Sequence, residues 1–332
     1  MGRTRPRRAR GGWFAALACA CAWSTTAEAF LGCARPRATR MGTDGPPLSR
    51  GAWSRAVATT ATGLVGAAMP ALAAPAGVVP TVKLEGEIKS QFNKANAAGS
   101  TQQFELAFKL YSQVLRYAPG YVYGWSNRGN IQIALGDLKA AVADYTQALE
   151  LASDLNIPDA WLIHLNRGTT WLALGETENA LQDLNQAVNL NPRPDTLTLA
   201  NRAQAYERRG EWTLASRDYE GAVKLSPGDV QPWWLRLALV EFQEGKQVDA
   251  LAFLRRVQAK FGSGGEVGVA LTALLFGGGQ THEAERTWAG VALPDQAKYL
   301  DAAFLTDKLA WPPQVVTSLM NFDKLVVRGD LS

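Results

Sequence analysis

The stretch "YGWSNRGNIQIALGDLKAAVADYTQAL", residues 123–149, contains two features that return further along the chain. Its Asn-Arg-Gly at 127–129 recurs as Asn-Arg-Gly at 166–168 and as Asn-Arg-Ala at 201–203. An aspartate follows each arginine at the same interval of sixteen residues, at Asp144, Asp183 and Asp218. Opposite charges kept at one spacing through three copies belong either to a binding site or to the frame of a repeat.

A lattice of small and large residues surrounds these charges. Five small residues are each followed twelve positions later by an alanine, and four positions beyond that by a large side chain. The small residues are Ala95, Gly129, Gly168, Ala203 and Ala238, the alanines are Ala107, Ala141, Ala180, Ala215 and Ala250, and the large residues are Tyr111, Tyr145, Leu184, Tyr219 and Leu254. Small residues let two helices approach closely, and the large residues fill the space between them.

This pattern resembles the tetratricopeptide repeat (TPR) family, whose unit of about 34 residues is a pair of antiparallel helices. The resemblance covers residues 88–264, or five units, and the longest step between units contains "SDLNIPD" at 153–159, which we expect to form an extended loop. It implies an all-α fold, a right-handed TPR superhelix of antiparallel helix pairs with a helical C-terminal cap. Since no unit can bury its apolar face alone, the units must stack.

The repeated charges gain an interpretation from this hairpin. The chain folds back midway through a unit, so that the arginine of the first helix lies opposite the aspartate of the second. We therefore expect three ion pairs within hairpins, Arg128–Asp144, Arg167–Asp183 and Arg202–Asp218. As surface pairs each would contribute only ~0–1 kcal/mol. For the neighbouring asparagines two interpretations stay open, a hydrogen bond across the seam between units or contact with a ligand.

The resemblance also implies a concave face lined by the first helix of each unit, where a partner would bind. The residues it assigns to this groove are Tyr123, Asn127, Asn130, Leu162, Leu165, Asn166, Leu172, Asn201, Gln204, Leu235, Leu239 and Phe242. The basic residues of the clamp that holds chaperone tails are absent from the matching positions. The groove is predominantly apolar, with a polar end near Glu207 and Arg208, which favours an apolar or amphipathic segment of a partner protein.

Catalytic and metal-binding patterns are missing. After residue 73 the chain has no cysteine and only two histidines, His164 and His282. We recognise no nucleophile–base arrangement, no metal-ligand spacing and no phosphate-binding loop there. We expect no enzyme, no cofactor and no metal. His164 stands where other units carry the first-helix aromatic, so we interpret it as a core residue.

The C-terminal region, 265–332, is predicted to be a degenerate sixth hairpin followed by a helical cap. Ala284 and Trp288 occupy the second-helix positions of that hairpin. Apolar residues at helical spacing continue through 295–325. This segment either docks against the last hairpin or folds back over part of the concave groove, where it would compete with a partner.

The first 73 residues have the composition of a targeting sequence. Residues 1–29 combine an arginine-rich start, a short apolar run and Ala-Glu-Ala, typical of a signal peptide. Residues 30–55 are arginine-rich and transit-like, 56–73 form a second apolar run that we interpret as a thylakoid-transfer signal, and 74–87 form a linker. The whole resembles presequences of thylakoid-lumen proteins in secondary plastids. Three alternatives stay open: residues 56–73 as the end of a stromal transit peptide, the same run as a membrane anchor, and Cys33 as a bacterial lipoprotein site.

The net charge of the chain also changes sign after residue 73. Residues 1–73 carry ten arginines, no lysine and two acidic residues, which leaves 24 basic and 28 acidic residues in the rest. A net negative body offers little attraction to a phosphate backbone. We therefore favour a protein-interaction scaffold in the thylakoid lumen, assisting assembly or maintenance of a photosynthetic complex, over the alternative of a stromal RNA-binding helical-repeat protein.

The position of the second Ala-x-Ala predicts the mature N-terminus. Cleavage after Ala73 leaves a protein that begins near Ala74 and is protected from protease in intact thylakoids. N-terminal sequencing and protease treatment before and after membrane rupture measure both properties. An intact 56–73 segment, or digestion without rupture, would contradict the lumenal location.

Overall fold

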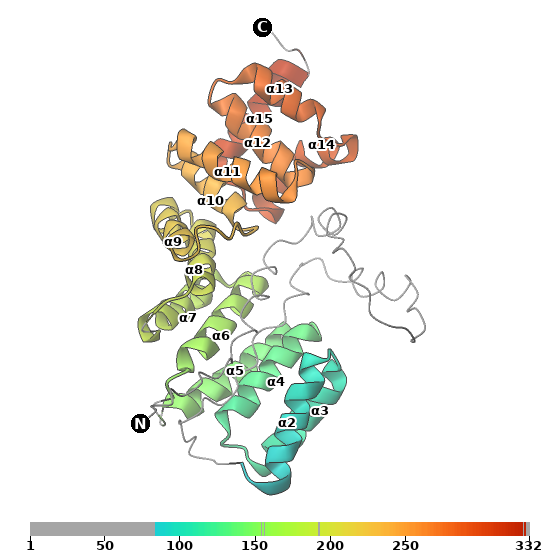
Figure 1. Ribbon diagram of the computed structural model, residues 1–332, viewed down its shortest axis with the longest axis vertical. Coiled ribbons are helices and arrows are strands. Elements are labelled where there is room, and N and C mark those ends of the chain that lie inside the picture. The colour runs from blue at the N-terminus through green and yellow to red at the C-terminus, as the bar shows by residue number, and fades with distance from the viewer. Residues whose placement is uncertain (1–83, 154, 156, 192, 328, 330–332) are drawn as a thin grey trace, which may run out of the picture.

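The computed structural model describes residues 84–327 and 329, except 154, 156 and 192. The predicted signal peptide, transit-like segment and thylakoid-transfer signal, 1–73, lie outside the described residues, as does most of the linker. All regular structure in the described part is helical (Figure 1). The all-α fold predicted from the sequence is therefore confirmed.

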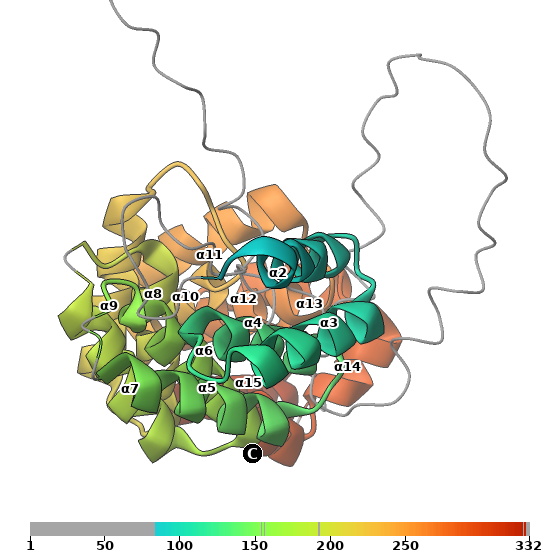
Figure 2. The same ribbon diagram turned by 90° about the horizontal axis from the view of Figure 1, so that it is seen from below.

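Five consecutive helix pairs, hairpins 1 to 5, carry the repeat. They are α2 (Gly86–Ser100) with α3 (Phe104–Tyr117), α4 (Val122–Ala134) with α5 (Leu138–Ser153), α6 (Ala160–Leu174) with α7 (Thr177–Leu190), α8 (Thr196–Arg208) with α9 (Trp212–Leu225), and α10 (Trp234–Gln243) with α11 (Gln247–Phe261). The connection predicted at 153–159 lies between α5 and α6. Viewed along the long axis, successive pairs are rotated relative to one another (Figure 2).

The close approach of the two helices in each pair follows from the small residues. A Cβ added to Gly129 would lie 2.8 Å from the Tyr145 ring, and one added to Gly168 would lie 2.9 Å from Leu184 Cγ. The alanines at the equivalent positions, among them Ala95 and Ala203, are fully buried. The glycine that follows α6, Gly175, has φ +83°, the left-handed conformation that ends a helix at little cost for glycine.

The C-terminal region continues the stack and then turns back. A sixth pair, hairpin 6, consists of α12 (Gly265–Gly277) and α13 (Thr281–Ala289), with Ala284 and Trp288 buried as expected. After it come α14 (Leu293–Tyr299), the π-helical turn η1 (Phe304–Lys308), α15 (Pro313–Phe322) and a second π-helical turn, η2 (Asp323–Val327). Helix α15 packs against α12 and α10, which are the first helices of hairpins 6 and 5.

Substitution of Gly168 tests the close approach. Alanine favours a helix over glycine by about 1 kcal/mol, yet Gly168→Ala should lower the free energy of unfolding by about 1–3 kcal/mol, because the new methyl group overlaps Leu184 and the backbone of Ala180. Urea unfolding measures the change.

Gly221 in α9 provides the matched control. The single atom near its added Cβ is the flexible Leu199 Cδ1 at 3.3 Å. Gly221→Ala should therefore leave stability unchanged or raise it by about 0.5–1 kcal/mol. Equal stabilisation by both substitutions would show that Gly168 is not needed for packing.

Candidate protein-binding surface

The three arginine–aspartate pairs predicted from the spacing form as two-pronged hydrogen bonds. Arg128 Nε donates to Asp144 Oδ2 at 2.7 Å, Arg167 Nε to Asp183 Oδ2 at 2.7 Å, and Arg202 Nε to Asp218 Oδ2 at 2.6 Å. In each pair the second terminal nitrogen donates to the other carboxylate oxygen at 2.8–3.0 Å. The expectation of surface pairs is wrong, because the aspartate side chains are only 4–6% exposed.

Each arginine also bonds to the preceding hairpin, a contact not expected from the arginine–aspartate spacing. Arg128 Nη1 donates to Ser112 Oγ at 3.2 Å, Arg167 Nη1 to Thr146 Oγ1 at 3.0 Å, and Arg202 Nη1 to Asn185 Oδ1 at 3.3 Å. These acceptors stand five residues after Ala107, Ala141 and Ala180, so a polar residue at that fixed offset was the available signal. The charge ladder thus joins hairpins as well as the helices within each hairpin.

His164 belongs to this ladder. In hairpin 2 the equivalent residue is Trp125, whose ring lies 4.8 Å from the Arg128 guanidinium carbon. In hairpin 3 the His164 Nδ1 atom instead lies 2.8 Å from Asp183 Oδ1. Burial raises the pKa of Asp183, but the hydrogen bonds from His164 and Arg167 and their charges outweigh it, so this pKa lies below its usual value.

The repeated asparagines lie at the seam between hairpins. Asn127 Nδ2 donates to Asn96 Oδ1 at 3.2 Å, Asn166 Nδ2 to Asn130 Oδ1 at 3.1 Å, and Asn201 Nδ2 to Thr169 Oγ1 at 3.3 Å. In hairpin 2 the Tyr145 hydroxyl also donates to Asn130 Oδ1, at 2.6 Å. Of the two interpretations left open by the sequence, these contacts favour the bond across the seam.

Most of the residues assigned to the groove are not open to a partner in this conformation. Three are half-buried, Leu162, Asn201 and Gln204. The other nine are buried, namely Tyr123, Asn127, Asn130, Leu165, Asn166, Leu172, Leu235, Leu239 and Phe242. The last three are buried because the C-terminal segment, residues 309–322, packs on them. Its Trp311, Val315 and Leu319 belong to the same buried cluster.

A buried charge pair marks where the C-terminal segment begins. Arg236, the residue of hairpin 5 equivalent to Asn166, pairs with Glu207 of hairpin 4. The Tyr219 hydroxyl donates to the same carboxylate at 3.1 Å. Next to this pair Arg208, which is exposed, donates from Nη1 to the Leu172 carbonyl oxygen at 2.6 Å. The polar end expected near Glu207 and Arg208 is thus a buried ion pair beside an exposed arginine.

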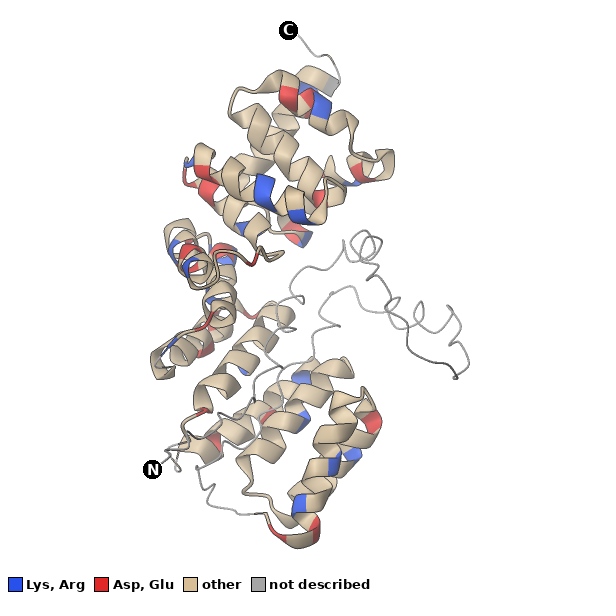
Figure 3. Cartoon of the chain, viewed as in Figure 1, with Lys and Arg blue, Asp and Glu red and all other residues tan. Residues whose placement is uncertain are grey.

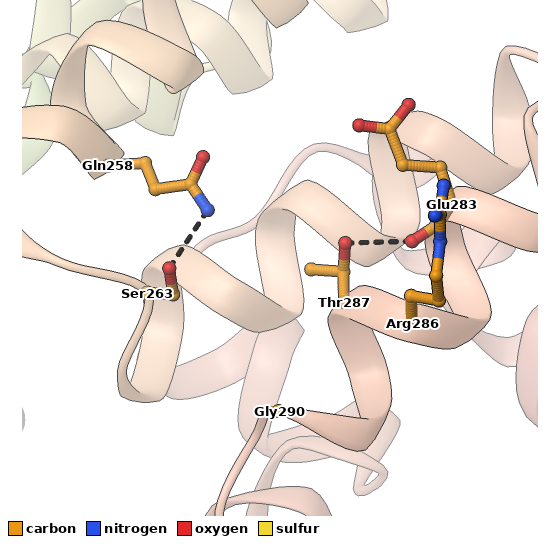
Figure 4. A pocket seen from close by; sticks show the side chains of 6 residues that line it. All are labelled: Gln258, Ser263, Glu283, Arg286, Thr287 and Gly290. Atoms are coloured by element: carbon orange, nitrogen blue, oxygen red, sulfur yellow. Dashed lines mark hydrogen bonds between the residues drawn. The ribbon is translucent and has the colours of Figure 1, made fainter.

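A hollow in the described residues lies elsewhere, on the second helices α11 and α13 (Figure 4). It has a volume of about 360 Å³ and is lined by Gln258, Ser263, Glu283, Arg286, Thr287 and Gly290. Gln258 Nε2 donates to Ser263 Oγ at 2.8 Å, and Thr287 Oγ1 to the Glu283 carbonyl at 2.8 Å, so these polar groups bond to one another. Across the whole described part of the chain, no three or more His, Cys, Asp or Glu residues are grouped so that they could bind a metal ion.

Comparisons with known proteins agree with this architecture. Sequence models of the tetratricopeptide repeat match residues 122–155 and 201–264. PilW, described as a widely conserved type IV pilus biogenesis factor, is 16% identical, and the match covers 71% of this chain and 100% of that one with a TM-score of 0.51. The APC/C hetero-tetramer Cut9–Hcn1 matches at 14% identity over 71% of this chain and 42% of that one, with a TM-score of 0.50.

YrrB, described as a TPR protein with an unusual peptide-binding site, is 20% identical over 51% of this chain and 84% of its own, with a TM-score of 0.44. No curated protein sequence matches the chain significantly. Likenesses at these identities establish the fold alone. The chain carries tetratricopeptide repeats arranged as a superhelix of helix pairs.

The ladder should contribute to stability, and a double-mutant cycle measures how much. Arg167→Ala and Asp183→Ala should each lower the free energy of unfolding by about 1–3 kcal/mol, because each removes the two-pronged ion pair of a largely buried charged partner. The double mutant should lose less than the sum. The exposed pair Arg255–Glu283 is the control, with an expected effect below about 1 kcal/mol.

The cycle has a pH readout as well. Because the folded-state pKa of Asp183 is lowered, its contribution is complete above the unfolded pKa of about 3.9 and is lost as pH falls through the lower folded value. Asp183→Asn should lack this loss. If Arg167→Ala instead left unfolding unchanged and abolished partner binding, the arginine would belong to a binding site and not to the frame.

Proposed function

We propose that the protein is a non-enzymatic interaction scaffold whose TPR array binds an apolar or amphipathic segment of a partner protein. The observation that carries this proposal is the stack of five helix pairs in which two stretches match TPR sequence models. Such solenoids present extended concave surfaces, and binding is their general use. The partner's identity is set by the side chains that remain accessible on the first helices.

The surface that fits this role lies on α6 and α8. Leu162 and Leu197 are half-buried at equivalent positions of hairpins 3 and 4, and Gln204 and the exposed Arg208 follow on α8. The corresponding surface of hairpins 5 and 6 is covered by α15. A partner segment with apolar side chains on one face and a polar or acidic group toward Arg208 would match this surface.

Electrostatics favour a protein partner over RNA. Residues 74–332 carry an excess of four acidic residues. Acidic and basic segments are interspersed along the helices in the view of Figure 3. An RNA-binding repeat array needs a basic face to bind the phosphate backbone. The stromal RNA-binding alternative therefore has no support from the charge distribution.

We place the protein in a plastid, in the thylakoid lumen, where its partner would be a subunit or assembly intermediate of a photosynthetic complex. This part of the proposal rests on the composition of residues 1–73 and on the resemblance of that segment to lumenal presequences. A stromal location and anchoring by residues 56–73 are the alternatives. Within the described residues no helix has both the length and the apolar character needed to cross a bilayer.

A matched pair of charge substitutions tests the scaffold. Gln204→Arg introduces a long charged side chain on the first helix α8, whereas Asn179→Arg introduces the same side chain on an exposed position of the second helix α7. Tagged mature proteins are incubated with solubilised thylakoids, and captured proteins are quantified by mass spectrometry. We expect Gln204→Arg to reduce capture of the specific partner at least tenfold, with Asn179→Arg like the wild type.

Thermal melting of both variants must match the wild type for the comparison to hold. Capture that is insensitive to Gln204→Arg would remove the concave surface of α8 from the site. A third outcome would support the RNA-binding alternative instead. In that outcome the wild-type protein captures RNA that nuclease treatment removes, and it captures no specific protein.

A further inference from the structure

The C-terminal segment, residues 309–322, occupies the concave surface of hairpins 5 and 6. Helix α15 within it lies on α12 and α10. Its apolar side chains Trp311, Val315, Leu319 and Phe322 are buried, and the Phe322 ring contacts those of Phe276 and Trp288 edge-on. The segment thus lies in both places considered from the sequence, since it covers the first helices of hairpins 5 and 6 and also contacts Trp288 of the last hairpin. Competition with a partner stays a prediction.

Polar contacts fix the register of the segment. Trp311 Nε1 donates to Glu266 Oε1 at 2.9 Å, and the Ser318 hydroxyl donates to the Ala273 carbonyl at 2.6 Å. Glu266 and Ala273 lie at the same distances from Ala284, the second-helix alanine of hairpin 6, as Leu162 and Thr169 lie from Ala180 in hairpin 3. The backbone N–H of Gln314 donates to Gln243 Oε1 at 2.9 Å. The segment therefore uses the positions through which a TPR groove would hold a partner.

Arg236 makes the contact that is specific to this end of the array. In hairpins 2 to 4 the equivalent residue is an asparagine bonded to the preceding hairpin. Arg236 retains such a link through Glu207, and its Nη1 and Nη2 atoms also donate to the carbonyl oxygens of Leu309 and Ala310 at 2.8 and 2.7 Å. At this repeat position the asparagines of hairpins 2 to 4 join neighbouring hairpins, whereas Arg236 also joins the array to the C-terminal segment.

The receiving surface is shaped for a helix. A Cβ at Gly277 would lie 2.8 Å from Ser318 Oγ and would overlap Phe242, so α15 can approach α12 closely only because residue 277 is glycine. The helix is ten residues long, which is too short to be stable alone, so nearly all of its stability comes from this surface. Ala310, which lies shortly before α15, has a φ of +50°, a conformation that is unfavourable for alanine.

Hairpins 5 and 6 are also held together by contacts that do not involve the segment. Helix α10 packs on α11, α12 packs on α13, and α11 packs on α12. The segment thus packs on a surface whose helices also contact one another directly. Since it is tethered, its effective concentration is of the order of millimolar, and a free competitor binds only when the tethered copy is weakened or outmatched.

We propose that the concave surface of hairpins 5 and 6 is a helix-binding site, that residues 309–322 are its tethered occupant, and that a partner helix of the same chemistry exchanges with it. That chemistry is an aromatic residue with a ring N–H donor, prolines at the helix start and an apolar stripe along the helix. This inference rests on the proposed scaffold function and adds its regulation. The bound segment limits partner binding to hairpins 1–4, and its release extends the groove by two hairpins.

The first test is native-state hydrogen exchange on the full chain. If the segment is a tethered ligand, amides of α15 exchange through a local opening at least tenfold faster than amides of α12 at low denaturant. Trp311→Ala should accelerate α15 exchange a further tenfold or more with a smaller effect on α12. Identical exchange of α15 and α12 in the wild type and in the variant would show that the segment is a permanent part of the core and would overturn the proposal.

The second test uses a fluorescent peptide of residues 309–325 added to full-length protein. The peptide should bind Trp311→Ala at least tenfold more tightly than the wild type, because the tethered copy no longer competes. Ser318→Ala, a milder change that removes a single hydrogen bond, should show a smaller gain in the same direction and remains informative if Trp311→Ala unfolds. Thr317→Ala, on the exposed face of α15, is the matched control and should bind like the wild type.

A peptide that carries alanine in place of its tryptophan should fail to bind any of these proteins. Absence of binding to both weakened variants, with hairpins 5 and 6 still folded, would overturn the proposal. Because both tests use only this chain and its own peptide, their failure leaves the scaffold function untouched. Loss of partner capture by Gln204→Arg, measured separately, does not depend on the segment.

Discussion

Close contact between the two helices of each pair is the constraint on which the rest of the array depends. At Gly129 the absence of a side chain lets the Tyr145 ring lie against the α4 backbone. That position brings the Tyr145 hydroxyl within 2.6 Å of Asn130 Oδ1, and the same oxygen accepts the Asn166 amide of the next hairpin at 3.1 Å. Gly129 therefore determines how closely the two helices of hairpin 2 pack. Because it makes room for Tyr145, it also affects the contact between hairpins 2 and 3. Replacing the glycine would displace the ring first and the seam with it.

The charge ladder strengthens the same seams. Arg167 holds Asp183 within hairpin 3 and Thr146 of hairpin 2, so one guanidinium group joins three helices. The planar fork of arginine supplies the donors for both tasks, which a lysine could not do with the same geometry. Because the aspartates are buried, the ladder differs in kind from an exposed ion pair. Removing one partner leaves a desolvated charge, and the cost falls on the contact between neighbouring hairpins as well as on the hairpin itself. In an array stabilised by nearest-neighbour contacts, such a loss weakens every unit beyond it.

The helix pairs and the arginine–aspartate contacts could be predicted because fixed intervals encode them. An offset that returns in several units locates both partners of a contact in the sequence, as it does for Arg128 and Asp144. The burial of the aspartates could not be predicted in this way, since it depends on side chains from the adjoining hairpin. Arg236 illustrates the limit more clearly. It occurs once, its acceptors Leu309 and Ala310 are backbone atoms more than seventy residues away, and no periodicity relates them. The burial of Leu235, Leu239 and Phe242 could not be predicted for the same reason, because the segment that covers them belongs to no repeat.

A solenoid must close the apolar face of its last unit, and the way this chain does so has a consequence for binding. A capping helix placed on the end of the stack would leave the concave face open. Here α15 crosses the first helices of the last two hairpins, so the segment whose Phe322 contacts Phe276 and Trp288 also covers the inner surface of α10. Capping and occupation of the groove are therefore performed by one segment and cannot be varied separately. Any change that loosens α15 bares apolar surface at the end of the array and lengthens the concave surface in the same step. Opening the groove at hairpins 5 and 6 therefore also lowers the stability of these hairpins, because both depend on the contacts of the ten-residue helix α15.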